Sequence, residues 1–331
     1  MGSSFPRTPP QASPEFLAVF RAEADAGRSM TFARFMALAL YHAEVGYYRV
    51  QRPRVGKGSG TDFYTASSSG PMFGELVAAA CVTLLGGREP REFTFVEIGA
   101  ETEGGILAGV AHPFGATRVF RIGAPLDFPA QCVVFSNELF DAQPFQRFVF
   151  RDGAWREYGV QLRDALLVEI ELGPTPNTAL PARAPEGYIL DAPFAAAALV
   201  RQMVEPRWTG LFVACDYGKS WQELTDASPA GTARAYFRHT QSNDLLARPG
   251  EQDLTCHVCW DWLSDALTAG GFDRPQVQSQ EAFFIHHAAD VLAQISAAEA
   301  ARFSPRKQAL MQLLHPAHLG QKFQVLHARR A

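Results

Sequence analysis

The stretch VFSNELFDAQPF, Val134–Phe145, joins the end of an apolar run to a short polar segment. The chain is apolar up to Phe135 and then places Asn137, Glu138 and Asp141 close together. Continuous apolar runs of this kind are typical of parallel strands that are buried on both faces. Because ligands of open parallel sheets bind outside the carboxyl ends of the strands, we predict that these three side chains line a site. The same residues also suit a simpler interpretation, in which they cap a helix or close a turn.

The composition is that of an ordinary globular protein. The chain has 331 residues, of which 47% are hydrophobic and 19% are charged, and its net charge is -4. This length suits one large domain or two modest ones, and the charge provides no basic field for nucleic acid. No apolar run reaches the roughly 18 residues of a membrane-spanning helix. The N-terminal MGSSFPRTPPQASPEF lacks the apolar centre of a signal peptide. We therefore expect a cytoplasmic protein with no nucleic-acid partner and no membrane insertion.

Further runs along the chain predict an α/β fold with a mainly parallel sheet. Phe93–Ile98 is followed by Gly99, and Leu211–Cys215 is followed by Asp216, so both runs end as the first one does. We expect these runs and Cys132–Ser136 to be neighbouring core strands whose carboxyl ends meet at one cleft. The alternating segments FQRFVFR, REYGVQL and ALLVEIEL indicate an inserted antiparallel meander. QKFQVLHARR is predicted to be the last strand.

Helical periodicity and loop composition suggest how the chain is divided. We predict a disordered lead at residues 1–14, a helical region with a lid loop at 15–90, and an α/β domain at 91–331. The antiparallel insertion falls at about 145–190 within this last domain. A later helix is predicted to begin at Trp260 and to end at Gly270 or Gly271.

The cysteines give little support for a metal or redox centre. CHVC, Cys256–Cys259, has the spacing of two zinc ligands, but a zinc site needs four and the sequence has no second CxxC or HxxxH. We predict no metal, with both thiols buried before the helix at Trp260. A metal-dependent redox enzyme that also uses His286 and His287 is the weakest alternative, because these histidines follow AFFI and are predicted to end a strand.

Several motifs resemble the sequence blocks of the MidA-like S-adenosylmethionine-dependent methyltransferases. In chain order the blocks are FARFMALALYHAEVGYY, GTDFYTASSSGPMFGELVA, FVEIGA, VVFSNELFDAQPF, CDYG, GTARAYFRHT, RPGEQDLTCHVCWDWL and GQKFQVL. The resemblance runs from about residue 30 to the C-terminus, and NELFDAxP together with PGxxDLT is its most specific part. The family includes the mitochondrial complex I assembly methyltransferase, which dimethylates an arginine of a respiratory subunit.

The resemblance implies a class I, Rossmann-like methyltransferase fold with S-adenosyl-L-methionine as cofactor. It implies a protein substrate, with a respiratory-complex subunit as one candidate, and arginine as the methyl acceptor. Glu138 and Asp141 would hold the guanidinium, whose planar fork pairs with carboxylates, and Asn137 would lie near the adenosine or the transferred methyl group. The segment Asp62–Phe73 would act as the lid. The cofactor-binding residues implied in this way are Glu97, Gly99, Thr65, Phe73, Gly74 and Asn137.

The chain departs from the family pattern in the cofactor half. Glu101 and Glu103 stand where the family has a glycine-rich run, and two carboxylates there would face a ligand that itself carries one. The region about 20 residues further on, where a ribose-binding acid is expected, holds the segment 119–121 instead. The chain is also short here for two strand–helix units of about 30 residues each. We predict one strand, Thr117–Ile122, within Gly104–Ala130, and at most one short helix before it.

Two functions therefore stay open. The first is a methyltransferase that acts on a protein side chain, and the retained NELFDA segment and lid favour it. The second is a non-catalytic, methyltransferase-like binding or assembly module that has lost part of the cofactor site. The altered glycine run and the missing acid favour this second function. Binding of S-adenosylmethionine distinguishes the two, while the oligomeric state is open in both.

Overall fold

The computed structural model describes residues 12–49, 70–100, 102–121, 123–299 and 304–331. The predicted lead up to residue 11, most of the predicted lid, Thr65 and Glu101 lie outside these ranges. No helix within the described ranges is both long and apolar enough to cross a membrane. The chain forms two compact units. The first comprises Met1–Phe63, Ala142–Phe194 and Gln222–Cys256, and the second comprises Tyr64–Asp141, Ala195–Trp221 and His257–Ala331.

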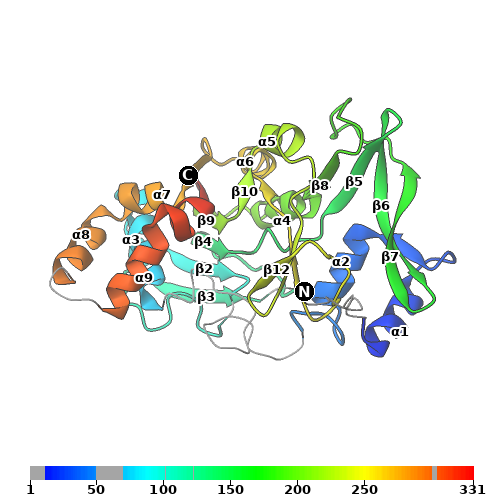
Figure 1. The fold of residues 1–331 in the computed structure, drawn as a ribbon. Coiled ribbons are helices and arrows are strands. Elements are labelled where there is room, and N and C mark those ends of the chain that lie inside the picture. The colour runs from blue at the N-terminus through cyan, green and yellow to red at the C-terminus, as the bar shows by residue number, and fades with distance from the viewer. Residues whose placement is uncertain (1–11, 50–69, 101, 122, 300–303) are drawn as a thin grey trace, which may run out of the picture. The chain divides into compact units, whose positions relative to one another are not determined.

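The second unit is built on a six-stranded, mainly parallel sheet of described residues (Figure 1). In spatial order its strands are β15 (Gln276–Ser279), β16 (Gln324–Arg330), β9 (Thr209–Asp216), β4 (Gln131–Asn137), β2 (Thr94–Ile98) and β3 (Ala116–Phe120). The neighbours β9, β4, β2 and β3 are parallel, whereas β16 runs antiparallel to β9 and β15 runs antiparallel to β16. The three predicted core strands are neighbours, as expected, and the predicted last strand is confirmed.

Helices cover both faces of this sheet, which explains the continuous apolar runs in the sequence. In β4, Val133 and Phe135 belong to the core on one face, and Cys132 and Val134 belong to the core on the other. The first face packs against α3 (Pro71–Leu84), α7 (Gln280–His287), α8 (Ala289–Ala298) and α9 (Pro305–Leu314). The second face packs against α4 (Phe194–Val204) and α6 (Trp260–Ala269). The helix predicted from Trp260 is thus confirmed, with Gly270 as its C-cap.

One element of the second unit corrects the sequence interpretation. His286 and His287 end helix α7 and do not end a strand. The helix begins because the hydroxyl of Ser279 accepts a hydrogen bond from the backbone N–H of Ala282 at 3.2 Å, which satisfies one of the donors that a helix start leaves unpaired. The apolar run AFFI was ambiguous, since a short buried helix and a buried strand share this pattern.

The segment between β2 and β4 is shorter than two strand–helix units, as predicted. Its described residues contain one strand, β3, and residues 102–115 form turns but no helix. Specific contacts fix it instead. The Oε2 atom of Glu97 accepts the backbone N–H of Ile106 at 2.7 Å, and Gly105 lies so close that a Cβ there would be 2.2 Å from the same oxygen. On the other side, a Cβ at Gly74 of α3 would lie 2.1 Å from the carbonyl oxygen of Ile106.

A buried arginine near the C-terminus closes the ends of two helices. Nε of Arg330 donates to the carbonyl oxygen of Trp208 at 2.6 Å, and Nη2 donates to that of Pro206 at 2.7 Å. Nη1 donates to the carbonyl oxygens of Val204 and Gly270, both at 2.9 Å. These carbonyls lie at and just beyond the C-termini of α4 and α6, where backbone acceptors lack intrahelical partners and a positive charge is favoured.

Arg330→Lys is expected to lower the free energy of unfolding by about 2–4 kcal/mol, because one ammonium cannot reach four carbonyls and a buried acceptor without a partner costs about 1–3 kcal/mol. Urea unfolding of this variant measures the loss. The matched control is Arg201→Lys, at an exposed arginine of α4. Equal stabilities of the two variants would show that the guanidinium is not needed at the helix ends.

The first unit contains the N-terminal helices and the predicted antiparallel meander. α1 (Pro14–Glu23) and α2 (Phe32–Tyr41) are capped by the hydroxyls of Ser13 and Thr31. The larger sheet holds β1 (Ser29–Thr31), β5 (Gln146–Arg151), β6 (Ala154–Arg163), β7 (Leu166–Pro174) and β8 (Ile189–Ala192). Its consecutive strands β5, β6 and β7 pair antiparallel, which confirms the predicted insertion.

Several short elements complete the structure. A small antiparallel sheet in the first unit is formed by β11 (Arg234–Phe237), β12 (Thr240–Ser242) and β13 (Asp253–Thr255). In the second unit β10 (Gly218–Lys219) pairs with β14 (Val258–Cys259). The remaining described elements are α5 (Trp221–Asp226), η2 (Pro90–Glu92) and η3 (Pro316–Gly320).

Candidate functional site

The ends of β2, β4 and β9 meet at the turn of residues 138–141. Gly99, directly after β2, has a φ of 78° and lies so close to Leu139 that a Cβ would be 2.8 Å from its Cδ1 atom. Only glycine combines this backbone angle with so close an approach. On the other side, the backbone N–H of Glu138 donates to the carbonyl oxygen of Cys215 in β9 at 3.0 Å. The predicted meeting of the three strand ends is therefore confirmed.

The carboxylate of Asp216 holds this turn from the end of β9. Its side chain is 0% exposed. Oδ2 accepts the backbone N–H groups of Phe140 at 2.8 Å and Asp141 at 3.3 Å, and Oδ1 accepts that of Tyr217 at 2.8 Å. Burial raises the pKa of Asp216 to about 7, and the hydrogen bonds from the backbone act in the opposite direction. Asp216 is thus a positioning residue, which sequence reasoning placed at a strand end but did not include in the site.

Asn137 and Glu138 form a polar pair at the end of β4. Nδ2 of Asn137 donates to Oε1 of Glu138 at 3.1 Å. Glu138 has a φ of 50°, a left-handed conformation that costs a residue other than glycine about 1–3 kcal/mol and that clusters at functional sites. Because the amide faces Glu138 through its nitrogen, Oδ1 of Asn137 is left as a buried acceptor without a hydrogen-bond partner in the described part of the chain. A buried acceptor of this kind suits a donor on a ligand.

The third predicted catalytic residue, Asp141, is 4% exposed. It is the last residue of the turn, and its backbone is fixed by the hydrogen bond to Asp216. The structure therefore brings Asn137, Glu138 and Asp141 together at the carboxyl ends of the strands, where Gly99 also lies. These four predicted site residues are held in place by one short turn and the ends of two strands, β2 and β4.

The other predicted cofactor residues in the described ranges are buried in or beside β2 and in α3. Glu97 is buried in β2 with its carboxylate bound to the segment after the strand. Phe73 is 0% exposed, and its ring packs edge-on against Phe135 and Phe284, so the structure gives it a role in the core. Gly74 allows α3 to approach the segment after β2. Phe73 and Gly74 are therefore buried supports of the site. They pack inside the core, where they are not exposed to a ligand.

The altered glycine run carries a carboxylate, Glu103, that is paired with an arginine of the chain. Oε1 of Glu103 lies 3.3 Å from Nη2 of Arg121, which follows β3 at the place where a ribose-binding acid was expected. Both side chains are exposed, so the pair contributes little to stability. The positive charge of Arg121 partly offsets the negative charge of Glu103 near the end of β2.

The cysteines are not gathered into a cluster. All five are buried and none forms a disulfide, and Cys259 is the N-cap residue of α6. Burial raises the pKa of its thiol to about 12. In the ranges that the structure describes, no group of three or more His, Cys, Asp and Glu residues could hold a metal ion.

The comparisons with known proteins point to one class of enzyme. Residues 120–277 match the model of a family described as "Putative S-adenosyl-L-methionine-dependent methyltransferase". A crystal structure of a Burkholderia thailandensis protein bound to S-adenosyl-homocysteine has 26% sequence identity and a TM-score of 0.84, and the match covers 98% of this chain and 95% of that one. A native crystal structure of an uncharacterized protein from the same organism gives 25% identity and a TM-score of 0.80 over the same shares. No curated protein matches the chain.

The residues at the three strand ends fit this cofactor. S-adenosylmethionine offers amino and hydroxyl donors, and Oδ1 of Asn137 is a buried acceptor that needs one. Gly99 brings the backbone to the same edge without a side chain in the way. In sheets of this class the cofactor lies outside the carboxyl ends of the strands. The motifs, the family match over residues 120–277 and the fold agree: the chain resembles the MidA-like S-adenosylmethionine-dependent methyltransferases, and its fold and cofactor are those of a class I methyltransferase.

Proposed function

We propose that the protein transfers a methyl group from S-adenosylmethionine to the side chain of an arginine in a protein substrate. The observation that supports this most is the position of Glu138. The residue directly follows the core strand β4, and its backbone is in a strained, left-handed conformation. The amide of Asn137 holds its carboxylate. A carboxylate so placed suits a guanidinium, whose parallel N–H groups pair with its two oxygens.

The protein's own groups would bind and orient the acceptor nitrogen. When bound, the cofactor supplies an activated methyl group, so the main task of the site is positioning. Glu138 would hold the guanidinium and accept the proton that the methylated nitrogen releases. Asn137 holds the carboxylate of Glu138 in place, and Asp216 fixes the turn through its hydrogen bonds to the backbone.

The partner and the location belong to the same proposal. The family resemblance supports a protein substrate, with a subunit of a respiratory complex as one candidate. Five buried cysteines that form no disulfide are usual for a protein of a reducing compartment, which supports the cytoplasm.

The test is the identity of the methylated amino acid. The purified protein is incubated with methyl-tritiated S-adenosylmethionine and a hypomethylated protein extract, and the protein fraction is hydrolysed to amino acids. We expect the label in methylated arginine, and no label when excess S-adenosylhomocysteine is added. Label in methylated lysine or histidine alone would contradict the arginine assignment while keeping the methyltransferase activity.

A second candidate, a non-catalytic binding or assembly module, is favoured by one observation. Residues 102–115, which follow β2, contain no helix. In Rossmann-like sheets the N-terminus of the helix after the first strand receives the charged part of the ligand. Titration with S-adenosylhomocysteine separates the candidates, because the module would not bind it.

A further inference from the structure

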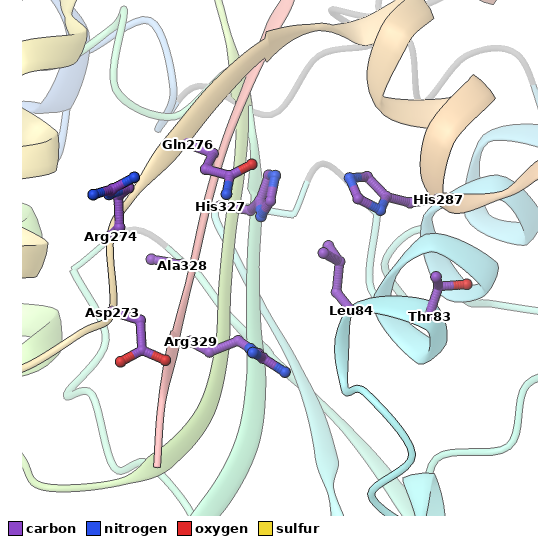
Figure 2. A pocket seen from close by; sticks show the side chains of 9 residues that line it. All are labelled: Thr83, Leu84, Asp273, Arg274, Gln276, His287, His327, Ala328 and Arg329. Carbon is purple, nitrogen blue, oxygen red and sulfur yellow. The ribbon is translucent and has the colours of Figure 1, made fainter.

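A hollow of about 390 Å³ lies in the second unit, between the ends of α3 and α7 and the strands β15 and β16 (Figure 2). Its volume is within the range of small-molecule sites. Arg329 of its lining pairs with Leu211 near the start of β9, whereas Asp216 ends that strand. Five residues of a strand span about 16 Å. The hollow therefore lies near the amino end of β9, whereas the turn of residues 138–141 lies at its carboxyl end.

The hollow is polar because the helical layer ends before the sheet does. On β16, Val325 belongs to the core, and His327 and Arg329 follow at alternate positions on the same face. α3 ends at Leu84 and α7 ends at His287, so the helices leave the last part of this face uncovered. Figure 2 shows His287 of α7 beside His327 of β16, and the centroids of the two rings are 5.2 Å apart.

A glutamine, Gln278, lies within hydrogen-bond distance of three histidines beside the hollow. Oε1 of Gln278 lies 3.0 Å from Nδ1 of His286, and Nε2 of Gln278 lies 3.1 Å from Nε2 of His327 and 3.4 Å from Nε2 of His287. An amide nitrogen donates two hydrogens, so it can serve both Nε2 atoms when each ring carries its proton on Nδ1. Burial and a neighbouring histidine lower the pKa of both rings, that of His327 to about 4. Each ring is thus neutral at pH 7 and offers one N–H donor.

Donors outnumber acceptors around the hollow. Arg274 and Arg329 line it, and neither makes an ion pair within the described part of the chain. The guanidinium of Arg329 fits beside the end of α3, because a Cβ at Gly86 would lie 2.7 Å from its Nη1 atom. Gln276 adds an amide group to the lining. Asp273 is the carboxylate among the lining residues, and with two arginines against one aspartate the lining has a net charge of +1.

We propose that this hollow binds a small oxyanion, the phosphate or carboxylate group of a small molecule, with Arg329 and Arg274 as its charged partners and the imidazole N–H groups of His287 and His327 as further donors. The site is separate from the methyl-transfer site and does not depend on the proposed function. A phosphate or carboxylate accepts several N–H donors at once through charge-assisted hydrogen bonds, which are stronger than those that a neutral ligand forms.

The test uses inorganic phosphate and succinate as probes, with sodium chloride keeping the ionic strength constant at pH 7.5. Chemical shifts of the histidine ring nitrogens are followed in protein labelled with ¹⁵N-histidine. We expect a saturable shift at His287 and His327 with at least one probe. Saturation by phosphate alone would assign a phosphate ligand, and saturation by succinate alone would assign a carboxylate.

Arg329→Gln should weaken binding of the active probe about 10- to 100-fold, since a charge-assisted hydrogen bond contributes about 1.5–3 kcal/mol. Arg274→Gln should also weaken it, since both arginines line the hollow and both are exposed. The matched control Arg201→Gln should leave it unchanged, and all three variants should retain the wild-type circular dichroism spectrum. An Arg329→Gln variant that is folded and binds as tightly as wild type would overturn the proposal, as would shifts that sodium chloride alone reproduces.

Discussion

Glu138→Gln is expected to reduce methyl transfer to arginine by about 10²- to 10⁴-fold, because two charge-assisted hydrogen bonds of about 1.5–3 kcal/mol each are weakened and each 1.36 kcal/mol is tenfold in rate. Glutamine keeps the shape of the side chain and an oxygen that can accept from Asn137. The affinity for S-adenosylhomocysteine should therefore change little. The loss should appear mainly in turnover, since it affects orientation in the transition state.

Two further variants define this effect. Asp141→Asn should lower turnover less than Glu138→Gln, if Asp141 mainly orients the turn. Glu205→Gln, at an exposed glutamate after α4, should leave turnover unchanged. Wild-type turnover in the Glu138→Gln protein would exclude the role assigned to its carboxylate. Asn137 and Glu138 would then have the simpler role of closing the turn.

Asp216→Ala is expected to lower the free energy of unfolding by about 3–5 kcal/mol, because it leaves three backbone N–H groups without their acceptor and each buried unpaired group costs about 1–3 kcal/mol. The donors concerned are those of Phe140, Asp141 and Tyr217. Asp216→Asn keeps one acceptor oxygen and should lose less. Urea unfolding of both variants measures the difference. Equal losses would contradict a role that depends on the acceptor oxygens.

The pH dependence of stability gives an independent test of the same side chain. The pKa of Asp216 in the folded protein, about 7, lies above the ordinary value of 3.8. The folded protein therefore holds this proton more tightly, and the stabilisation that results is complete below about pH 4 and is lost as the pH rises towards 7. The stability of the wild type relative to Asp216→Asn should thus fall between about pH 4 and pH 7. A relative stability that rises over this range would be inconsistent with the raised pKa.

Much of the fold follows from the sequence because the central strands are buried on both faces. The alternation of Val133 and Val134 between two cores requires an apolar residue at every position, and this pattern can be recognised without a structure. The short segment before β4 was predictable from chain length alone. The helix that ends at His286 and His287 was not, since its start depends on the hydrogen bond of Ser279 and its apolar run also suits a strand.

The site was predictable in part. Asn137, Glu138 and Asp141 stand out as polar residues directly after a core strand, and the structure places them at the edge where three strands end. The role of Asp216 depends on hydrogen bonds to a turn that lies 75 and 76 residues earlier in the chain. The contact between Glu103 and Arg121 joins residues 18 positions apart. Such long-range contacts leave no periodic pattern in the sequence, so neither partner could be assigned before the fold was known.

Calorimetric titration with S-adenosylhomocysteine tests most directly whether this chain works as an S-adenosylmethionine-dependent methyltransferase. We expect saturable binding of one molecule per chain. Asn137→Ala should weaken it about tenfold, which corresponds to the loss of one hydrogen bond of about 1.4 kcal/mol to the buried Oδ1 atom. No saturable binding at millimolar ligand, in protein whose circular dichroism spectrum and cooperative unfolding show that it is folded, would contradict the account and favour the non-catalytic module.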